Sequence, residues 1–256
     1  ESVINAIIEQ VNNLIVESNI ERSDIIGVGI GAPGPLDAKK GVILKTPNLT
    51  IFQDYKIASD FTKRLKLDTF IENDANLFAL GECHSQYKEN KVTVGVTLGT
   101  GLGFGLVING ELFVGGHGMA MEYGLSPFEW GMCEKNVSIN FIRKRASELY
   151  NEELSPVIIE EYCKGGDKKA IQIYSEYGHN LGIVLSHVVN MIDPQVISIG
   201  GGLSNAFNCF KESMFSVIEK HAPSFNSNHT IIAQSKLREN STMIGACMMV
   251  KTKKNA

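Results

Sequence analysis

Three glycine-rich turns, each placed directly after a short apolar run, constrain this sequence more than any other feature. The turns are Gly31 to Gly34, Gly99 to Gly103 and Gly200 to Gly202. Short apolar runs that end in such turns are typical of buried strands. Ligands of open α/β sheets usually bind outside the carboxyl ends of strands. The sequence therefore predicts an α/β fold whose ligand cleft is lined by backbone.

The rest of the sequence alternates between helical and strand patterns, without repeats or low-complexity linkers. Helices are predicted where apolar residues recur every three or four positions, and strands where short apolar runs are bounded by turn residues. Asn109-Gly110 predicts a tight hairpin. The predicted helices cover residues 1–17, 75–83, most of 137–192, 203–220 and 242–250, and the predicted strands cover 25–31, 69–71, 92–98, 105–108, 111–114 and 196–199.

Composition excludes several classes of protein. The 256 residues carry a net charge of −4, which argues against a surface that binds nucleic acid throughout. No apolar stretch approaches the ~18 residues of a membrane span, so no membrane partner is expected. The five cysteines are odd in number and include no C-x-x-C pair, which argues against a disulfide scaffold or a zinc ribbon. We expect free thiols and a cytoplasmic location.

The turn at Gly99 to Gly103 has two interpretations. Glycines let backbone N–H groups approach an anion, and the Thr100 hydroxyl adds a donor, so the turn suits a phosphate group. It is not a dinucleotide fingerprint, because Phe104 stands where the third glycine belongs and a strand follows. A tight hairpin bend explains the same residues equally well.

Two carboxylates are candidates for chemistry. Asp74 lies where a predicted strand ends and a helix begins, so it either caps that helix or serves as a general base beside Asn73. The cap is the more ordinary role. Glu122 lies in a glycine-rich loop and either faces a polyol or is simply solvated. His117 is the one histidine near these motifs, and a single histidine does not make a metal site.

Taken together and in order, the motifs are specific. The chain resembles the ROK family (repressors, open reading frames and sugar kinases) over nearly its whole length. The motifs that carry the resemblance are Gly31-Ala32-Pro33-Gly34-Pro35-Leu36-Asp37, Pro47-Asn48-Leu49, Glu72-Asn73-Asp74-Ala75-Asn76, Leu98-Gly99-Thr100-Gly101-Leu102-Gly103, Asn109-Gly110, Asn190-Met191-Ile192-Asp193-Pro194 and Ile199-Gly200-Gly201-Gly202-Leu203-Ser204.

The resemblance implies a fold and a division into lobes. The fold is the two-lobed, actin-like ATPase (ribonuclease H-like) fold, with the first hairpin of the N-terminal lobe absent from this chain. A smaller α/β lobe is expected over residues 1–84 and 241–256. A larger α/β lobe with dimerisation helices is expected over residues 85–240. A sugar cleft lies between the two lobes in such a fold.

The resemblance also assigns roles to residues. Asp74 corresponds to the base that deprotonates the sugar hydroxyl, and here it is interpreted as a vestigial base. The sugar-binding set is Asn48, Asn73, Asp74 and Glu122, and the phosphate- and nucleotide-binding set is Thr100, Gly101, Gly200, Gly201 and Gly202.

Departures from the family pattern favour a protein that has lost catalysis. The phosphate-binding D-x-G-G-T segment does not occur in this chain, and Phe104 replaces a glycine of the phosphate turn. Leu125 stands where the family has a zinc-ligating histidine, and Cys133 is the one cysteine of the zinc segment. The last glutamate of that segment, a sugar ligand, aligns with Asn140. No zinc or other metal is therefore expected, and ATP only if the chain is a kinase.

Three functions are weighed on these grounds. The first is a non-enzymatic regulator of the degenerate xylose-repressor-like branch, a repressor or an anti-repressor in antibiotic resistance. It would bind sugar weakly or not at all, contact a regulatory protein, and bind DNA only through a domain upstream of Glu1. The alternative is an ATP-dependent hexose kinase, and the third is a pure interaction subunit. A homodimer is expected through residues 137–187, whose apolar positions include Ile171, Tyr174, Leu181 and Leu185.

Overall fold

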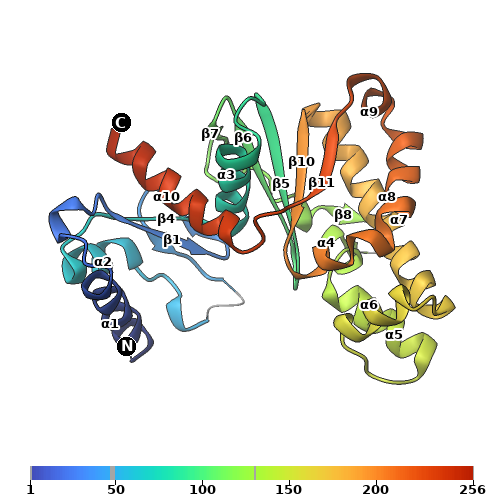
Figure 1. The fold of residues 1–256 in the computed structure, drawn as a ribbon, viewed down its shortest axis with the longest axis horizontal. Coiled ribbons are helices and arrows are strands. Elements are labelled where there is room, and N and C mark those ends of the chain that lie inside the picture. Colours follow the sequence, from blue (N-terminus) through green and yellow to red (C-terminus); the bar gives the residue numbers. More distant parts are fainter. Residues whose placement is uncertain (1, 47–49, 130, 256) are drawn as a thin grey trace.

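Two separate sheets form the framework of the computed structural model, which describes residues 2–46, 50–129 and 131–255 (Figure 1). The smaller sheet pairs β1 (Val28–Ala32) with β4 (Thr69–Asn73) in parallel. The helices α1 (Ser2–Glu17) and α2 (Ile57–Leu65) pack against this sheet through one buried cluster. The amphipathic spacing of α1 buries Ile4 and leaves its opposite face in solvent.

The larger sheet has the strand order β11-β10-β5-β6-β7. Its first three strands are parallel to one another, and β5, β6 and β7 are antiparallel. The parallel part brings the carboxyl ends of β5 and β10 to the same edge, where two of the glycine turns follow. The strands are β5 (Val92–Leu98), β6 (Leu102–Ile108), β7 (Glu111–Leu112), β10 (Val196–Gly200) and β11 (Ile231–Gln234).

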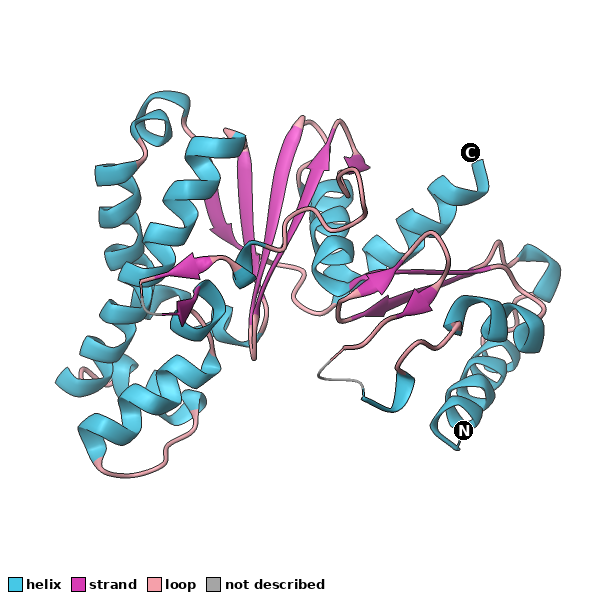
Figure 2. Cartoon of the chain, turned by 180° about the vertical axis from the view of Figure 1, so that it is seen from behind, coloured by secondary structure: helices cyan, strands magenta, loops and turns pink. Residues whose placement is uncertain are grey.

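Helices cover the outer face of the larger sheet, on the side away from β1 and β4 (Figures 1 and 2). The long helix α7 packs along α8, and together with the sheet they bury the largest apolar cluster. Asp167 caps the N-terminus of α7, where its side chain accepts a hydrogen bond from the N–H of Ala170 at 2.9 Å. These helices are α4 (Cys133–Asn136), α5 (Ile139–Tyr150), α6 (Pro156–Lys164), α7 (Lys168–Ile192), α8 (Phe207–His221) and α9 (Pro223–Asn228).

Two helices, α3 (Asp74–Gln86) and α10 (Asn240–Asn255), lie between the two sheets (Figure 1). They cross with their backbones almost in contact. A Cβ added at Gly81 would lie 1.8 Å from the carbonyl oxygen of Ser241, and one added at Gly245 would lie 1.9 Å from that of Leu77. Any side chain at either position would force the helices apart, so the two glycines make the crossing possible.

The α/β class predicted from the sequence is confirmed, and several boundaries are corrected. The strand β6 begins at Leu102 rather than Gly105, because Gly103 and Gly105 pass close under α3 as part of the strand. The second glycine turn therefore ends earlier than predicted. The helix α10 starts before Thr242 and extends to Asn255. The elements α2, α4, α9 and β11 were not predicted, because their patterns in the sequence are short and weak. Also unpredicted are β2 (Leu36–Asp37), β3 (Val42–Ile43), β8 (Pro127–Phe128), β9 (Gly131–Met132) and the 3₁₀ turns η1 (Arg22–Asp24), η2 (Thr50–Phe52), η3 (Tyr123–Leu125) and η4 (Gly202–Ala206).

The apolar face offered for a homodimer lies inside the monomer. Tyr174, Leu181 and Leu185 are each 0% exposed and pack in the core of the larger sheet. Ile171 alone of the four is exposed. Helical periodicity identifies an apolar face but not what covers it, and here α8 and the sheet cover it. A dimer through residues 137–187 and the lobe boundaries at 84/85 and 240/241 stay predictions. Within the described ranges, no helix is both long and apolar enough to cross a membrane.

Candidate functional site

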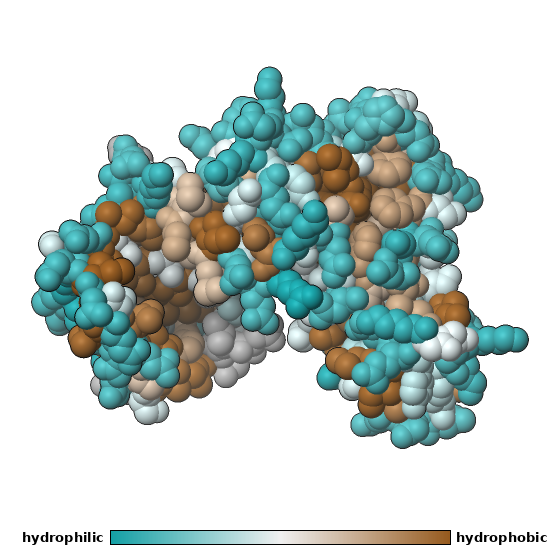
Figure 3. Space-filling model, viewed as in Figure 1, coloured by the Kyte–Doolittle hydropathy of each residue, from teal (hydrophilic) through white to brown (hydrophobic). Residues whose placement is uncertain are grey.

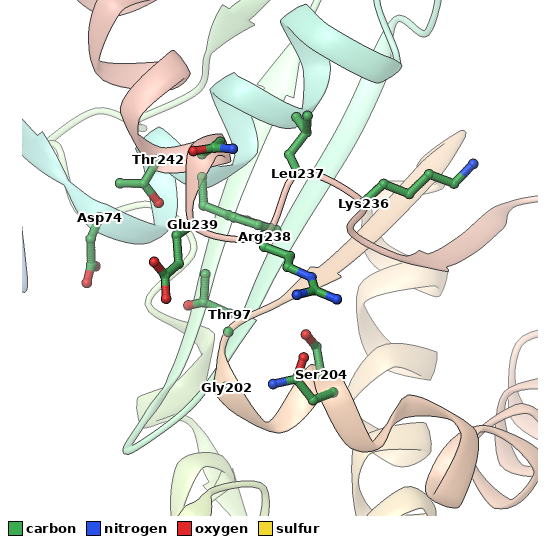
Figure 4. Close-up of a pocket in the computed structure, with 13 residues that line it drawn as sticks. Asp74, Thr97, Gly202, Ser204, Lys236, Leu237, Arg238, Glu239 and Thr242 are labelled. Atoms are coloured by element: carbon green, nitrogen blue, oxygen red, sulfur yellow. The ribbon is translucent and has the colours of Figure 1, made fainter.

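Two cavities open between the sheets, in the region where the molecular surface is hollowed (Figure 3). The first has a volume of about 690 Å³. Figure 4 shows the Arg238 side chain reaching into it toward Ser204, while Lys236 extends away from both. Its walls are Asp74, Phe78, Thr97, Gly201, Gly202, Ser204, Asn205, Lys236, Leu237, Arg238, Glu239, Asn240 and Thr242.

The second cavity, of about 580 Å³, adjoins the first. Asp74, Thr97 and Gly201 belong to the walls of both, so the two spaces meet at these residues. All three glycine turns reach this region, together with the N-terminus of α3. The other residues around the second cavity are Pro33, Gly34, Pro35, Asn73, Leu98, Gly99, Thr100, Gly101, Leu102, Gly103, Met119, Glu122, Leu125 and Glu134.

The structure shows which residue caps the helix α3. Asn73 is the N-cap of α3, and its Oδ1 accepts hydrogen bonds from the N–H groups of Ala75 at 2.9 Å and Asn76 at 3.3 Å. Asp74 is the first residue of the helix, and its Oδ1 also accepts from the N–H of Ala75 at 2.9 Å. The expectation that Asp74 is the cap is therefore wrong. Its exposed carboxylate faces both cavities at the positive end of the helix dipole.

Asn73 and Glu122 face the glycine turn that follows β1. A Cβ added at Gly34 would lie 3.2 Å from Asn73 Nδ2 and 3.4 Å from Glu122 Oε1. Because Asn73 Oδ1 is occupied by the cap, its Nδ2 is the atom directed toward the turn. Beneath it, the buried Glu72 accepts hydrogen bonds from Asn73 N–H at 2.9 Å and from Asn76 Nδ2 at 3.0 Å. This arrangement holds the Asn73 side chain in place.

A second carboxylate, which the sequence analysis passed over, stands beside Glu122. Glu134, in the short helix α4, lies on the wall of the second cavity. Burial and the negative charges of Asp74 and Glu134 raise the pKa of Glu122 above its ordinary value. The alignment of the sugar-binding glutamate with Asn140 is not supported, since Asn140 is exposed at the start of α5 and lines neither cavity. Glu134 lies six residues before Asn140 and directly follows Cys133 in the sequence.

The third glycine turn places three glycines in three environments. Gly200 is buried, and a Cβ there would lie 2.4 Å from the Phe78 ring, so this residue lies beneath the cavity. Gly201 has a φ of 82° and lines both cavities. Gly202 has no atom within 4 Å of an added Cβ, which leaves its backbone open to the first cavity. Thr100 and Gly101 lie on the wall of the second cavity.

The predicted set of site residues and the walls of the cavities differ at two points. Asn48 lies outside the described residues. Conversely, Thr97, Arg238 and Thr242 line the first cavity, and the sequence analysis did not select them. Arg238 follows β11, a strand that was missed, so the general rule for strand carboxyl ends would have found it once β11 had been recognised.

The residues at the expected zinc position do not fit a zinc ion. Leu125 is 53% exposed and offers no ligand atom. Cys133 is buried in the apolar cluster that includes Phe128 and Val137, and this burial raises the pKa of its thiol. Among the described residues, no three His, Cys, Asp or Glu side chains come together as a metal site. Apolar contacts around Cys133 hold this segment in place.

We expect purified protein to contain far less than one zinc ion per chain. The reason is that a structural zinc site needs four ligands, and Cys133 alone is available in this segment. Elemental analysis after dialysis without chelator measures this directly. Stoichiometric zinc that a chelator removes with loss of the fold would contradict the prediction.

Sugar kinases are prominent among the proteins with similar sequences. An N-acetyl-D-glucosamine kinase from Pectobacterium atrosepticum is 33% identical over 199 residues, which cover 70% of this chain and 65% of that protein. A glucokinase from Thermotoga maritima is 28% identical over 275 residues, covering 95% of this chain and 86% of that protein. The chain thus spans about two thirds of the length of the first of these relatives.

Solved structures establish the fold. A ROK hexokinase from Thermus thermophilus superposes with a TM-score of 0.86 at 24% identity, covering 98% of this chain and 86% of that one. The predicted actin-like ATPase fold is therefore confirmed. A transcriptional regulator of the same family superposes equally well, with a TM-score of 0.87 at 21% identity. The fold alone does not separate enzyme from regulator.

The sequence comparisons contradict the interpretation of the chain as a non-enzymatic regulator. Kinases of N-acetylglucosamine and glucose predominate among the relatives, including proteins 32% to 33% identical. A proposed xylose repressor from Caldicellulosiruptor is 28% identical and is covered over 62% of its length. An anti-repressor role has no support from these relatives. The departures from the family pattern are therefore weak evidence against catalysis, because Asp74, Glu122 and Glu134 all line the second cavity.

Family membership rests on the whole chain rather than on any one motif. The sequence model of the ROK family matches residues 1–253. The match includes each glycine turn, the Asn73-Asp74 pair, the helix α3 and all but the last two residues of α10. This chain therefore belongs to the ROK family.

Proposed function

We propose that this protein is an ATP-dependent hexose kinase. The observation that carries the proposal is the meeting of two cavities at a single exposed carboxylate, Asp74. Phosphoryl transfer between two ligands needs their reacting ends to face each other, with a base beside the attacking hydroxyl. Asp74, Thr97 and Gly201 occupy that junction.

The first cavity suits the nucleotide. Gly202 exposes backbone without a side chain in the way, and Arg238 brings a positive charge to the same wall. Backbone N–H groups near Thr100 and Gly101, on the wall of the adjoining second cavity, would receive the terminal phosphates. These features stabilise negative charge, which is the main protein contribution to phosphoryl transfer.

The second cavity suits the sugar. Glu122 and Glu134 supply acceptors for sugar hydroxyls, and Asn73 Nδ2 supplies a donor. Asp74 takes the proton from one sugar hydroxyl, and the oxygen of that hydroxyl forms a bond to the γ-phosphorus of ATP. The bond from that phosphorus to the β–γ bridging oxygen breaks, and ADP leaves. The relatives named for glucose and N-acetylglucosamine suggest these two sugars as the first substrates to test.

A coupled spectrophotometric assay tests the proposed function. The protein, expressed from its whole coding sequence, is given ATP and, in separate reactions, glucose, N-acetylglucosamine, N-acetylmannosamine and xylose. We expect ADP formation that depends on one of the hexoses. Absence of turnover with every sugar, in protein shown to be folded by circular dichroism, would refute the kinase. A cytoplasmic location and the absence of zinc remain part of the proposal.

Replacing Glu134 by Gln should weaken sugar binding. The loss of one charge-assisted hydrogen bond costs about 1.5–3 kcal/mol, so the KM for the sugar should rise about tenfold or more. The same change removes a charge that raises the pKa of Glu122, so the acid limb of the kcat/KM profile should move to lower pH. Steady-state kinetics between pH 5 and 9 measure both effects, with Asn140→Ala as the control. A larger effect from Asn140→Ala would contradict this assignment.

A further inference from the structure

One buried carboxylate, that of Glu82, lines neither cavity and takes no part in the proposed phosphoryl transfer. Glu82, two turns along α3 from Asp74, is 0% exposed, and no cation among the described residues pairs with it. Four donors surround it instead. Its Oε2 accepts from Ser198 Oγ at 2.6 Å and from Gln86 Nε2 at 3.1 Å, and its Oε1 accepts from the hydroxyls of Ser235, at 2.6 Å, and Ser241.

The three serines come from three elements of the fold, although Ser235 and Ser241 are only six residues apart in the sequence. Ser198 lies on β10, Ser235 directly follows β11, and Ser241 is the second residue of α10. Each segment continues into a wall of the first cavity. From β10 the chain reaches Gly201 and Gly202, and the residues after Ser235 run from Lys236 to Asn240 and Thr242. Glu82 thus joins the segments that build the nucleotide side of the cleft.

Ser235 carries this restraint into the loop. While its hydroxyl donates to Glu82, its Oγ accepts hydrogen bonds from the N–H groups of Leu237 at 3.2 Å and Arg238 at 3.3 Å. Arg238 has a φ of 53°, a conformation that a non-glycine residue adopts only when its surroundings hold it there. The backbone that directs the Arg238 side chain into the cavity therefore depends on Ser235.

The same carboxylate also belongs to the helix that presents Asp74. At the adjacent residue, Gly81, α3 touches the backbone of α10, so the two helices are locked together at this point. We propose that Glu82 is a positioning residue of the proposed kinase: it sets the nucleotide-binding wall at a fixed place relative to Asp74. The proposal rests on the proposed function for its kinetic consequence. Its structural basis is the four-donor network.

The test compares Ser235→Ala with wild type, because this variant removes one hydroxyl and no charge. We expect the KM for ATP to rise about tenfold, while the KM for the sugar changes by less than about twofold. Calorimetric titration with a non-hydrolysable ATP analogue should show the same loss of affinity. Glu82→Gln should raise the KM for ATP more strongly. In wild type the serine hydroxyls donate to the carboxylate, whereas in the variant the amide N–H groups are donors that face these same donors.

The matched control is Ser186→Ala, which removes another buried serine hydroxyl, one that donates to Gly182 within α7 away from both cavities. It should leave both KM values unchanged. If Ser235→Ala lowers the unfolding temperature but not ATP affinity, Glu82 only stabilises the fold and the proposal is overturned. Equal rises in the KM for ATP and for sugar overturn it as well.

The result also separates this proposal from the proposed function. If wild type binds the ATP analogue but phosphorylates no sugar, the kinase proposal fails, and the titrations with Ser235→Ala still decide the role of Glu82. If wild type binds no nucleotide, both proposals fail. Normal turnover by wild type with an unchanged ATP affinity in Ser235→Ala removes the positioning role alone.

Discussion

Replacing Asp74 by Asn should lower kcat by a factor of about 10² to 10⁴, the usual contribution of a positioned general base. The amide has the same shape and can still accept the hydrogen bond that Ala75 N–H donates to Asp74 Oδ1, so the helix start should be preserved. It cannot take a proton from the sugar hydroxyl. The KM values for both substrates should change much less than kcat. Steady-state kinetics with the best hexose measure the effect.

The control for this variant is Asp24→Asn, which neutralises an exposed carboxylate that lines neither cavity. Its kcat should match that of wild type. Titration of the sugar into the Asp74 variant shows whether the binding site survives. A variant that keeps more than half of the wild-type kcat would show that another group removes the proton, and the role given to Asp74 would have to be abandoned.

The second large effect is expected at the glycine shared by both cavities. Gly201 has φ 82° and ψ 169°, a region of conformational space open essentially to glycine. A Cβ there would lie 2.4 Å from the carbonyl oxygen of Leu98, at the end of β5. Gly201→Ala should therefore lower the free energy of unfolding by about 2–5 kcal/mol, the sum of backbone strain and overpacking. For a chain of this length the unfolding temperature should fall by about 5–15 °C.

The neighbouring glycine separates stability from ligand binding. A Cβ at Gly202 meets no atom within 4 Å, so Gly202→Ala should keep the unfolding temperature close to that of wild type. Its methyl group enters the first cavity, so the KM for ATP should rise. Differential scanning calorimetry and ATP titration of both variants measure the two effects. Equal unfolding temperatures for Gly201→Ala and wild type would be incompatible with the described turn.

Much of the fold follows from local patterns in the sequence. The apolar spacing of α1, the strand-glycine junctions at Gly99 and Gly200, and the Asn109-Gly110 hairpin were all predicted in the right class. These signals are local, because a strand that ends or a helix that starts depends on a few adjacent residues. Each family motif is also a short local pattern, so the order of the motifs along the sequence was enough to identify the family.

Other features were decided only by packing between distant segments. The burial of Tyr174 within the monomer depends on which elements cover that face of α7. The cavity position of Glu134 instead of Asn140 depends on how α4 folds back toward Glu122.

The network around Glu82 is the clearest example of this difference. Its serine partners Ser198, Ser235 and Ser241 are 116, 153 and 159 residues away in the sequence. A glutamate and three serines at such separations carry no periodic signal, so the sequence by itself determined the helix that bears Glu82 but not its partners. The tertiary structure decided them, because a carboxylate removed from water is stable only where donors from several segments converge on it.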